Sequence, residues 1–137
     1  MKKLIIAAFA LFALSACNDG KDQEKALQDE VIKIHDKVMA DDNRLMDNKM
    51  KIDTLITTTP YIDTAKKAEL TRLKAELMVA EQAMENWMQN FDPEKGSKSH
   101  EDKVTYLTDQ KKQIMTIDSL MNAAIDKSTQ YLNTIKK

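Results

Sequence analysis

An all-α fold, a bundle of three long antiparallel helices in up-down-up order, is the fold class that the sequence predicts. Glycine and proline, which interrupt helices, occur only twice each among 137 residues. The chain is instead rich in alanine, leucine, lysine, glutamate, glutamine and methionine, all of which favour helix. Three long segments also carry apolar residues at alternating spacings of four and three, the pattern of one helical face. Together these observations predict amphipathic helices around a single core.

The N-terminus has the layout of a secretory signal peptide. Lys2 and Lys3 precede an unbroken apolar run over residues 4–14, and small residues follow the run. The run has about half of the ~20 apolar residues that a transmembrane helix needs. We therefore expect residues 1–16 to be cleaved, leaving a mature chain that starts at Cys17, the only cysteine.

The segment Leu14-Ser15-Ala16-Cys17 resembles the lipobox of bacterial lipoproteins. The resemblance implies that the signal is cut before Cys17 and that this cysteine carries acyl chains such as palmitate. Two or three acyl chains anchor a protein stably in a bilayer, whereas one chain does so only marginally. The alternative is an ordinary signal peptide that is cut elsewhere. If Cys17 is acylated, no thiol is left for a disulfide or for catalysis.

The residues after the cysteine are polar and acidic. Residues 17–22 suit a lipidated cysteine followed by a short tether. Residues 18–24 also resemble the acidic stretch that follows the cysteine in surface-exported lipoproteins of Bacteroidota. Either interpretation places the mature domain in the cell envelope, facing the periplasm or on the outer-membrane surface.

The first predicted helix, about residues 23–57, has a wide apolar face. Its main stripe has polar residues, Asp41 and Asn48, at two core positions, and such residues fix helix register at a cost in stability. A second stripe lies beside the first and contains Ile32, His35, Met39, Met46 and Met50. This width predicts a helix that contacts two neighbours.

The second predicted helix covers about residues 60–91. Either Thr59 before Pro60 or Asp63 before Thr64 caps its start. Its apolar seam is uninterrupted and consists of Leu70, Leu73, Leu77, Ala80, Met84, Trp87 and Phe91. This regularity predicts a helix that is packed along its whole length.

The third predicted helix covers about residues 99–135 and completes a bundle over residues 23–137. Ser99 and Asp102 resemble a capping box at its start, with aspartate in place of the usual glutamate. Its stripe consists of Val104, Leu107, Ile114, Ile117, Met121, Ala124, Ser128, Tyr131 and Ile135. The short loops make consecutive helices antiparallel neighbours.

One cluster of side chains in this bundle is a candidate binding site. Folding the first hairpin about residue 60 brings His35 level with Glu85, and the second hairpin adds Tyr106 to the same layer. The cluster that results contains His35, Met39, Met84, Trp87 and Met88.

This cluster has two interpretations. Imidazole and thioether donors favour copper(I), so His35, Met39, Met84 and Met88 are the candidate metal ligands, with haem as a variant. The residue types resemble the ligand set of a periplasmic copper chaperone family. The alternative is an apolar core or partner-facing patch, because methionine commonly fills irregular gaps in helical bundles.

The sequence contains no pattern that indicates catalysis. It lacks the His-Glu-x-x-His and Glu-x-x-His metal motifs and a glycine-rich phosphate loop. The mature chain has 19 basic and 22 acidic side chains after Lys2 and Lys3 are removed, so nucleic acid is not an expected partner. We therefore expect a protein that is not an enzyme and has no resident cofactor.

Three features of the mature chain resemble a known group of proteins. They are Ile34-His35-Asp36 with Met39, Trp87-Met88 with Phe91, and the spacing of the three predicted helices. These features are similar to small Bacteroidota lipoproteins of unknown function that are often labelled "viral A-type inclusion protein". The resemblance implies no catalytic residue. We expect a lipid-anchored protein that binds or scaffolds a protein partner through a helical face.

Overall fold

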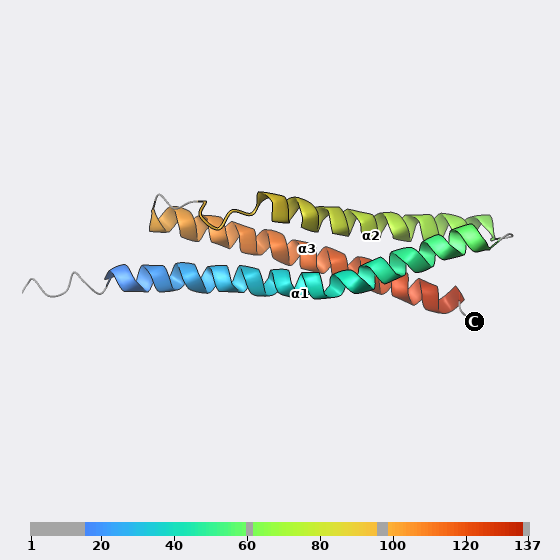
Figure 1. Cartoon of the computed structure of the whole chain (residues 1–137), viewed down its shortest axis with the longest axis horizontal. Coiled ribbons are helices and arrows are strands. Elements are labelled where there is room, and N and C mark those ends of the chain that lie inside the picture. Colours follow the sequence, from blue (N-terminus) through green and yellow to red (C-terminus); the bar gives the residue numbers. More distant parts are fainter. Residues whose placement is uncertain (1–15, 60–61, 96–98, 136–137) are drawn as a thin grey trace, which may run out of the picture.

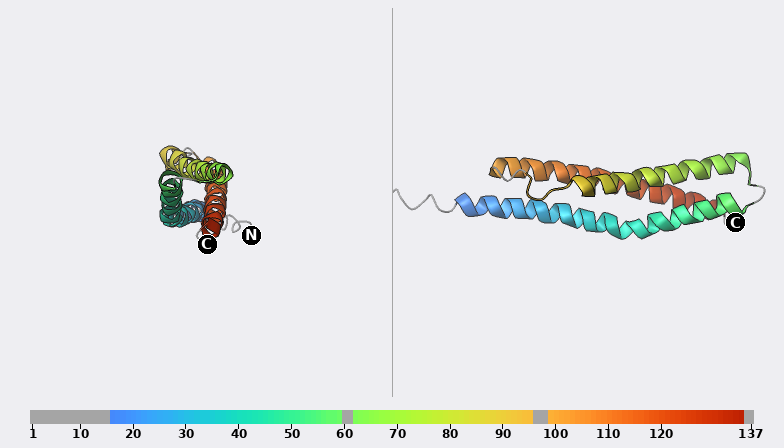
Figure 2. Two further views of the ribbon diagram at one scale, coloured as in Figure 1. Left: turned by 90° about the vertical axis from the view of Figure 1, so that its right-hand side faces the viewer. Right: turned by 45° about the horizontal axis from the view of Figure 1, so that its top comes forward.

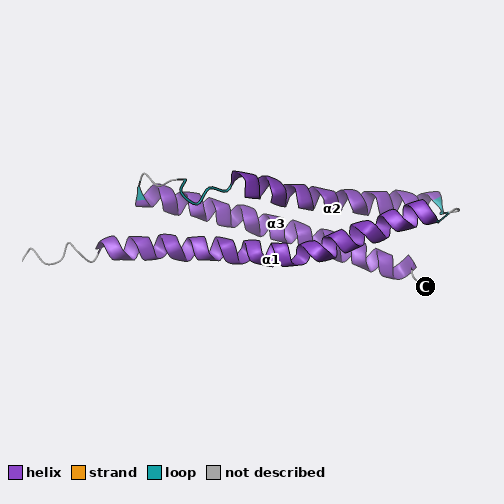
Figure 3. Cartoon of the chain, viewed as in Figure 1, coloured by secondary structure: helices purple, strands orange, loops and turns teal. Residues whose placement is uncertain are grey.

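The computed structural model describes residues 16–59, 62–95 and 99–135, with side chains from Gly20 onward. These residues form three helices and no strand (Figures 1 and 3). Helix α1 is Ala16–Thr58, α2 is Thr64–Asn90 and α3 is His100–Ile135. Helices α1 and α3 run in the same direction and α2 runs in the opposite direction, and each helix contacts both others (Figure 1). The predicted three-helix bundle is confirmed.

Helix α1 begins at Ala16, well before the predicted start near residue 23. Residues 17–22, predicted to be a tether, are therefore helical. The start of α3 packs on this turn: a Cβ atom on Gly20 would lie 3.3 Å from the His100 ring. In addition, His100 Nδ1 and Glu24 Oε1 form a hydrogen bond of 2.8 Å. The predicted signal peptide up to residue 15, and the side chain of Cys17, lie outside the described residues.

The start of α2 differs from the predicted position. The helix begins at Thr64 and not near residue 60, because Asp63 is its cap. Asp63 Oδ1 accepts hydrogen bonds from the backbone amides of Ala65, at 2.9 Å, and Lys66, at 3.2 Å. These bonds satisfy amides that have no partner inside the helix. Pro60, the alternative helix start, lies outside the described residues.

The cap of α3 matches the predicted capping box, and the helix itself begins at His100. Ser99 Oγ accepts a hydrogen bond from the Asp102 amide at 3.1 Å and donates one to Asp102 Oδ2 at 2.7 Å. The aspartate thus reaches the hydroxyl of the cap, whereas the glutamate of a standard capping box reaches the cap amide.

The core is one continuous apolar cluster along the bundle axis. The α2 seam is buried as predicted from Leu70 to Trp87, and Phe91, just beyond the helix, is half-buried. In α3 the buried positions shift after Ala124. The side chains buried there are Ile125, Ser128 and Leu132, while the predicted Tyr131 is only half-buried.

A polar layer interrupts this core between α1 and α3. The Asn48 amide nitrogen donates to Ile125 O at 3.2 Å, Ser128 Oγ at 2.9 Å and Thr129 Oγ1 at 2.8 Å. The Ser128 hydroxyl donates in turn to Ala124 O at 2.8 Å. Both Asn48 and Ser128 are buried, so these bonds take the place of the hydrogen bonds that exposed side chains would make to water.

Two ion pairs outside the core join α1 to α3 in the same register as the bond from Asn48 to Thr129. Lys111 bonds Glu30 at 2.6 Å, and Lys37 bonds Asp118 at 2.6 Å. Each pair joins residues 81 apart in sequence, as does the bond from Asn48 to Thr129. The constant separation shows that α1 and α3 keep one parallel register over this length.

Helix α2 covers less of α1 than α3 does. It has 27 residues, compared with 43 in α1 and 36 in α3, and it ends short of the N-terminal part of α1 (Figure 2). Helix α1 packs most extensively on α3 and least on α2. Two ion pairs, Lys49 with Glu81 and Lys74 with Asp53, connect α1 to α2.

Helix α1 contacts both neighbours, as the width of its apolar face predicts, but its second stripe is not covered by either. Four of its members are exposed: Ile32, Met39, Met46 and Met50. His35 alone is half-buried. The reason is that α2 packs beside the stripe and does not cover it.

Replacing Asn48→Ala should lower the free energy of unfolding by about 1–3 kcal/mol, since it removes the amide that links α1 to α3. Urea unfolding followed by circular dichroism measures this change. Asn43→Ala, at an exposed position of the same helix, should alter stability by less than about 0.5 kcal/mol. Equal effects of the two substitutions would contradict the role given to the polar layer.

Candidate functional site

The predicted cluster is centred on a contact between His35 of α1 and Trp87 of α2. Their ring centroids lie 6.0 Å apart. Trp87 stacks on Phe91 at 4.8 Å, and Phe91 lies 6.4 Å from Tyr106 of α3. The predicted meeting of His35 with Trp87 is therefore confirmed. Tyr106 does not lie in the His35 layer, because the 81-residue separation places residue 116 there, and it reaches the cluster only through Phe91. Phe91, predicted as the last residue of the α2 seam, links Trp87 to Tyr106.

These aromatic rings also hold the chain where it leaves α2. The Tyr106 hydroxyl accepts a hydrogen bond from the backbone amide of Asp92 at 3.0 Å. The Lys95 ammonium lies 5.9 Å from the centre of the Tyr106 ring, within the range of a cation–π contact. The loop that joins α2 to α3 thus packs against the N-terminal part of α3.

His35 has one ring nitrogen committed to a neighbour. Its Nδ1 atom lies 2.9 Å from Asp36 Oδ1. A carboxylate at one nitrogen orients the ring and leaves Nε2 as the atom available to a ligand. Sequence spacing did not predict this bond, because consecutive helical residues do not share a face.

The three predicted methionines lie in two environments. Met84 is 3% exposed and belongs to the core, whereas Met39 and Met88 are 38% and 40% exposed. Copper(I) binding at the surface would thus draw on His35, Met39 and Met88 and not on Met84. Among the described residues, no group of three or more His, Cys, Asp or Glu side chains is placed to hold a metal ion. The copper or haem hypothesis stays a prediction.

A second surface feature is a set of exposed apolar side chains along the α1–α2 side. We name it the methionine row. Its members are each between 38% and 49% exposed: Ile32, Met39 and Met46 of α1, and Met78 and Met88 of α2. They make up five of the nine large apolar side chains that are exposed in the described residues.

The ion pair between Asp53 and Lys74 places the two halves of the methionine row together. Asp53 is one heptad after Met46 and two after Met39, so these three residues share one line along α1. On α2, Met88 is two heptads after Lys74 and thus shares its line. Moving two heptads along both antiparallel helices from the ion pair places Met39 and Met88 in the same region of the two helices, beside the contact between His35 and Trp87.

Met78 borders the same line of α2. It is four residues after Lys74 and three before Glu81, both of which pair with α1. Residues at these separations are neighbours on a helix surface. The methionine row is therefore one surface strip shared by two helices.

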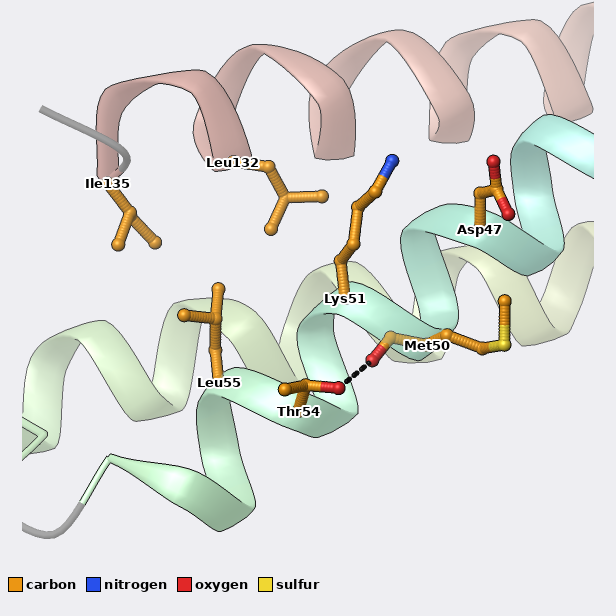
Figure 4. Close-up of a pocket in the computed structure, with 7 residues that line it drawn as sticks. All are labelled: Asp47, Met50, Lys51, Thr54, Leu55, Leu132 and Ile135. Atoms are coloured by element: carbon orange, nitrogen blue, oxygen red, sulfur yellow. Dashed lines mark hydrogen bonds between the residues drawn. The ribbon is translucent and has the colours of Figure 1, made fainter.

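A separate apolar groove lies between the C-terminal ends of α1 and α3 (Figure 4). Its volume is about 390 Å³, and Leu55, Leu132 and Ile135 form its apolar wall. Met50, Asp47, Lys51 and Thr54 complete the lining. The groove has room for a small apolar side chain or ligand.

Comparison with known proteins provides no relative. No protein-family model, curated protein or solved structure matches the chain. Among the described helices, none is long and apolar enough to cross a membrane.

One buried polar atom in the cluster has no partner. Trp87 is buried, and its Nε1–H makes no hydrogen bond within the described residues. An unsatisfied buried donor costs about 1–3 kcal/mol. The indole thus contributes apolar contact, and its polar atom opposes that contribution.

Trp87→Phe should accordingly lower the free energy of unfolding by less than about 1 kcal/mol, because losing the unpaired N–H offsets part of the lost contact. Trp87→Ala should lower it by about 3–5 kcal/mol. Urea unfolding followed by circular dichroism compares the two. A phenylalanine variant as unstable as the alanine variant would mean that the indole N–H has a partner.

Proposed function

We propose that this protein is a lipid-anchored docking or scaffolding protein of the cell envelope, without catalytic activity of its own. The observation that carries the proposal is the methionine row, an exposed apolar strip on two helices of a bundle whose core is otherwise complete. Exposed apolar surface is costly in water, and such strips are typical of protein interfaces.

The composition of the row supports docking over a purely structural role. Methionine side chains are flexible and polarizable, so a methionine-lined surface adapts to the shape of a partner. Each row member keeps part of its surface accessible, at similar exposed fractions. A helix laid along α1 and α2 would cover all of them together, as in helix-in-groove recognition.

The membrane anchor is the second part of the proposal. Its support is the lipobox-like segment that ends in Cys17, preceded by an apolar run too short to span a bilayer. Acylation of Cys17 would attach the N-terminal end of α1 to the membrane surface. The rest of the bundle would then extend into the envelope.

Docking predicts crosslinks from the methionine row in living cells. A photo-crosslinking amino acid at Met46 should give a discrete adduct of one partner protein, detected by immunoblot. The same amino acid at Met115, an exposed position of α3 outside the row, should give none. Adducts of the same pattern from both positions, or none from Met46, would contradict the proposal.

Anchoring predicts that Cys17→Ser abolishes incorporation of labelled palmitate and moves the protein out of the membrane fraction. Metabolic labelling followed by fractionation measures both effects. Two acyl chains are needed for stable attachment, so partial acylation should give partial release. Wild-type protein that is unlabelled and recovered with soluble proteins would indicate an ordinary cleaved signal peptide.

A further inference from the structure

Three carboxylates flank Met39 and Met88, the members of the methionine row nearest the contact between His35 and Trp87. Asp36 and Asp42 are each three residues from Met39 on α1, and Glu85 is three residues before Met88 on α2. Residues at this separation are surface neighbours. The centre of the row therefore combines apolar surface with negative charge.

These carboxylates have no lysine or arginine partner within the described residues. Asp36 bonds the His35 ring, and Glu85 accepts a hydrogen bond from the Gln82 amide at 3.3 Å. Asp42 is half-buried and makes no ion pair there. The charges of all three remain available to a partner.

The nearby cations offset only part of this charge. Lys33 is exposed three residues before Asp36 and is the one cation on α1 beside the three carboxylates that makes no ion pair within the described residues. Lys49 and Lys74, which border the row on α1 and α2, already pair with Glu81 and Asp53. Lys25 is one heptad before Ile32, at the end of the row that α2 does not reach. The electrostatic character of the row's centre is thus acidic.

We propose that the methionine row binds an amphipathic helix of another protein, with leucine-like residues on one face and lysine or arginine beside them. This inference rests on the proposed docking function and names the class of partner. The basic residues would pair with Asp36, Asp42 and Glu85, while the apolar face would cover Met39 and Met88. Charge complementarity of this kind selects the partner and speeds encounter.

The same charges argue against a second copy of this chain as the occupant. A symmetric dimer with its twofold axis at the centre of the row would bring the three carboxylates of one copy close to those of the other. Such like-charge contacts oppose association. A basic helix meets the same carboxylates with favourable charge.

The test uses the full-length protein in neutral detergent micelles, with empty micelles as the blank. Two labelled peptides of about 18 residues are long enough for the ~21 Å from Ile32 to Met46. Both carry the same leucine face, flanked by lysine in one and by glutamate in the other. Fluorescence anisotropy should show the lysine peptide binding at least about tenfold more tightly.

Matched variants separate the apolar and charged contributions. The double variant Met39→Gln with Met46→Gln should weaken binding of the lysine peptide at least about tenfold, whereas Met115→Gln should leave its affinity unchanged. The triple variant with Asp36→Asn, Asp42→Asn and Glu85→Gln should bind the lysine and glutamate peptides with affinities within about twofold of each other. As a control, the substitutions Glu101→Gln, Asp109→Asn and Asp126→Asn on α3 should preserve the difference. Circular dichroism checks that each variant keeps its helices.

Several results would overturn the inference. Equal binding of both peptides, no binding of the lysine peptide, or binding unaffected by the Met39 and Met46 substitutions would each do so. Concentration-dependent dimers that these substitutions abolish would identify a second copy as the occupant and would also overturn it. If Met46 still crosslinks to a partner in cells while the peptides fail, docking stands and only the basic-helix inference falls.

Discussion

The register of the bundle depends most on the buried amide of Asn48, because its three hydrogen bonds to α3 are made in the observed register. Apolar seams with a heptad repeat pack similarly after a slip of seven residues. A slip of α1 against α3 would leave the amide without Ser128 and Thr129, and a buried polar group without partners is costly. The Glu30–Lys111 and Lys37–Asp118 pairs share the 81-residue separation and add smaller contributions.

Periodicity predicts the core best where only one face is apolar. Along α2, from Leu70 to Trp87, a single seam satisfies the alternating spacing, and that seam is buried. In α3, apolar residues are adjacent at Ala124 and Ile125 and again at Tyr131 and Leu132. Spacing does not distinguish two neighbouring faces there, so the choice depends on how α3 lies against α1.

The candidate site shows the same division. Hairpin arithmetic predicts that His35 and Trp87 meet, because loop positions fix which residues lie level in antiparallel helices. The exposure of Met39 and Met46 is not predictable in this way. An apolar stripe looks the same in sequence whether a neighbour covers it or only borders it, and the width of α1's apolar face suggested coverage that α2 does not provide.

The early start of α1 at Ala16 gives the protein a fixed reach. If Cys17 carries the lipid, the helix leaves the bilayer with no flexible leash between anchor and bundle. At 1.5 Å per residue, Met39 then stands at most about 33 Å, and Met46 at most about 44 Å, above the anchored cysteine. A continuous helix of this kind would hold the methionine row within a narrow range of distances from the membrane. The distance of the row from the membrane, as well as its surface chemistry, would then determine which proteins can contact it.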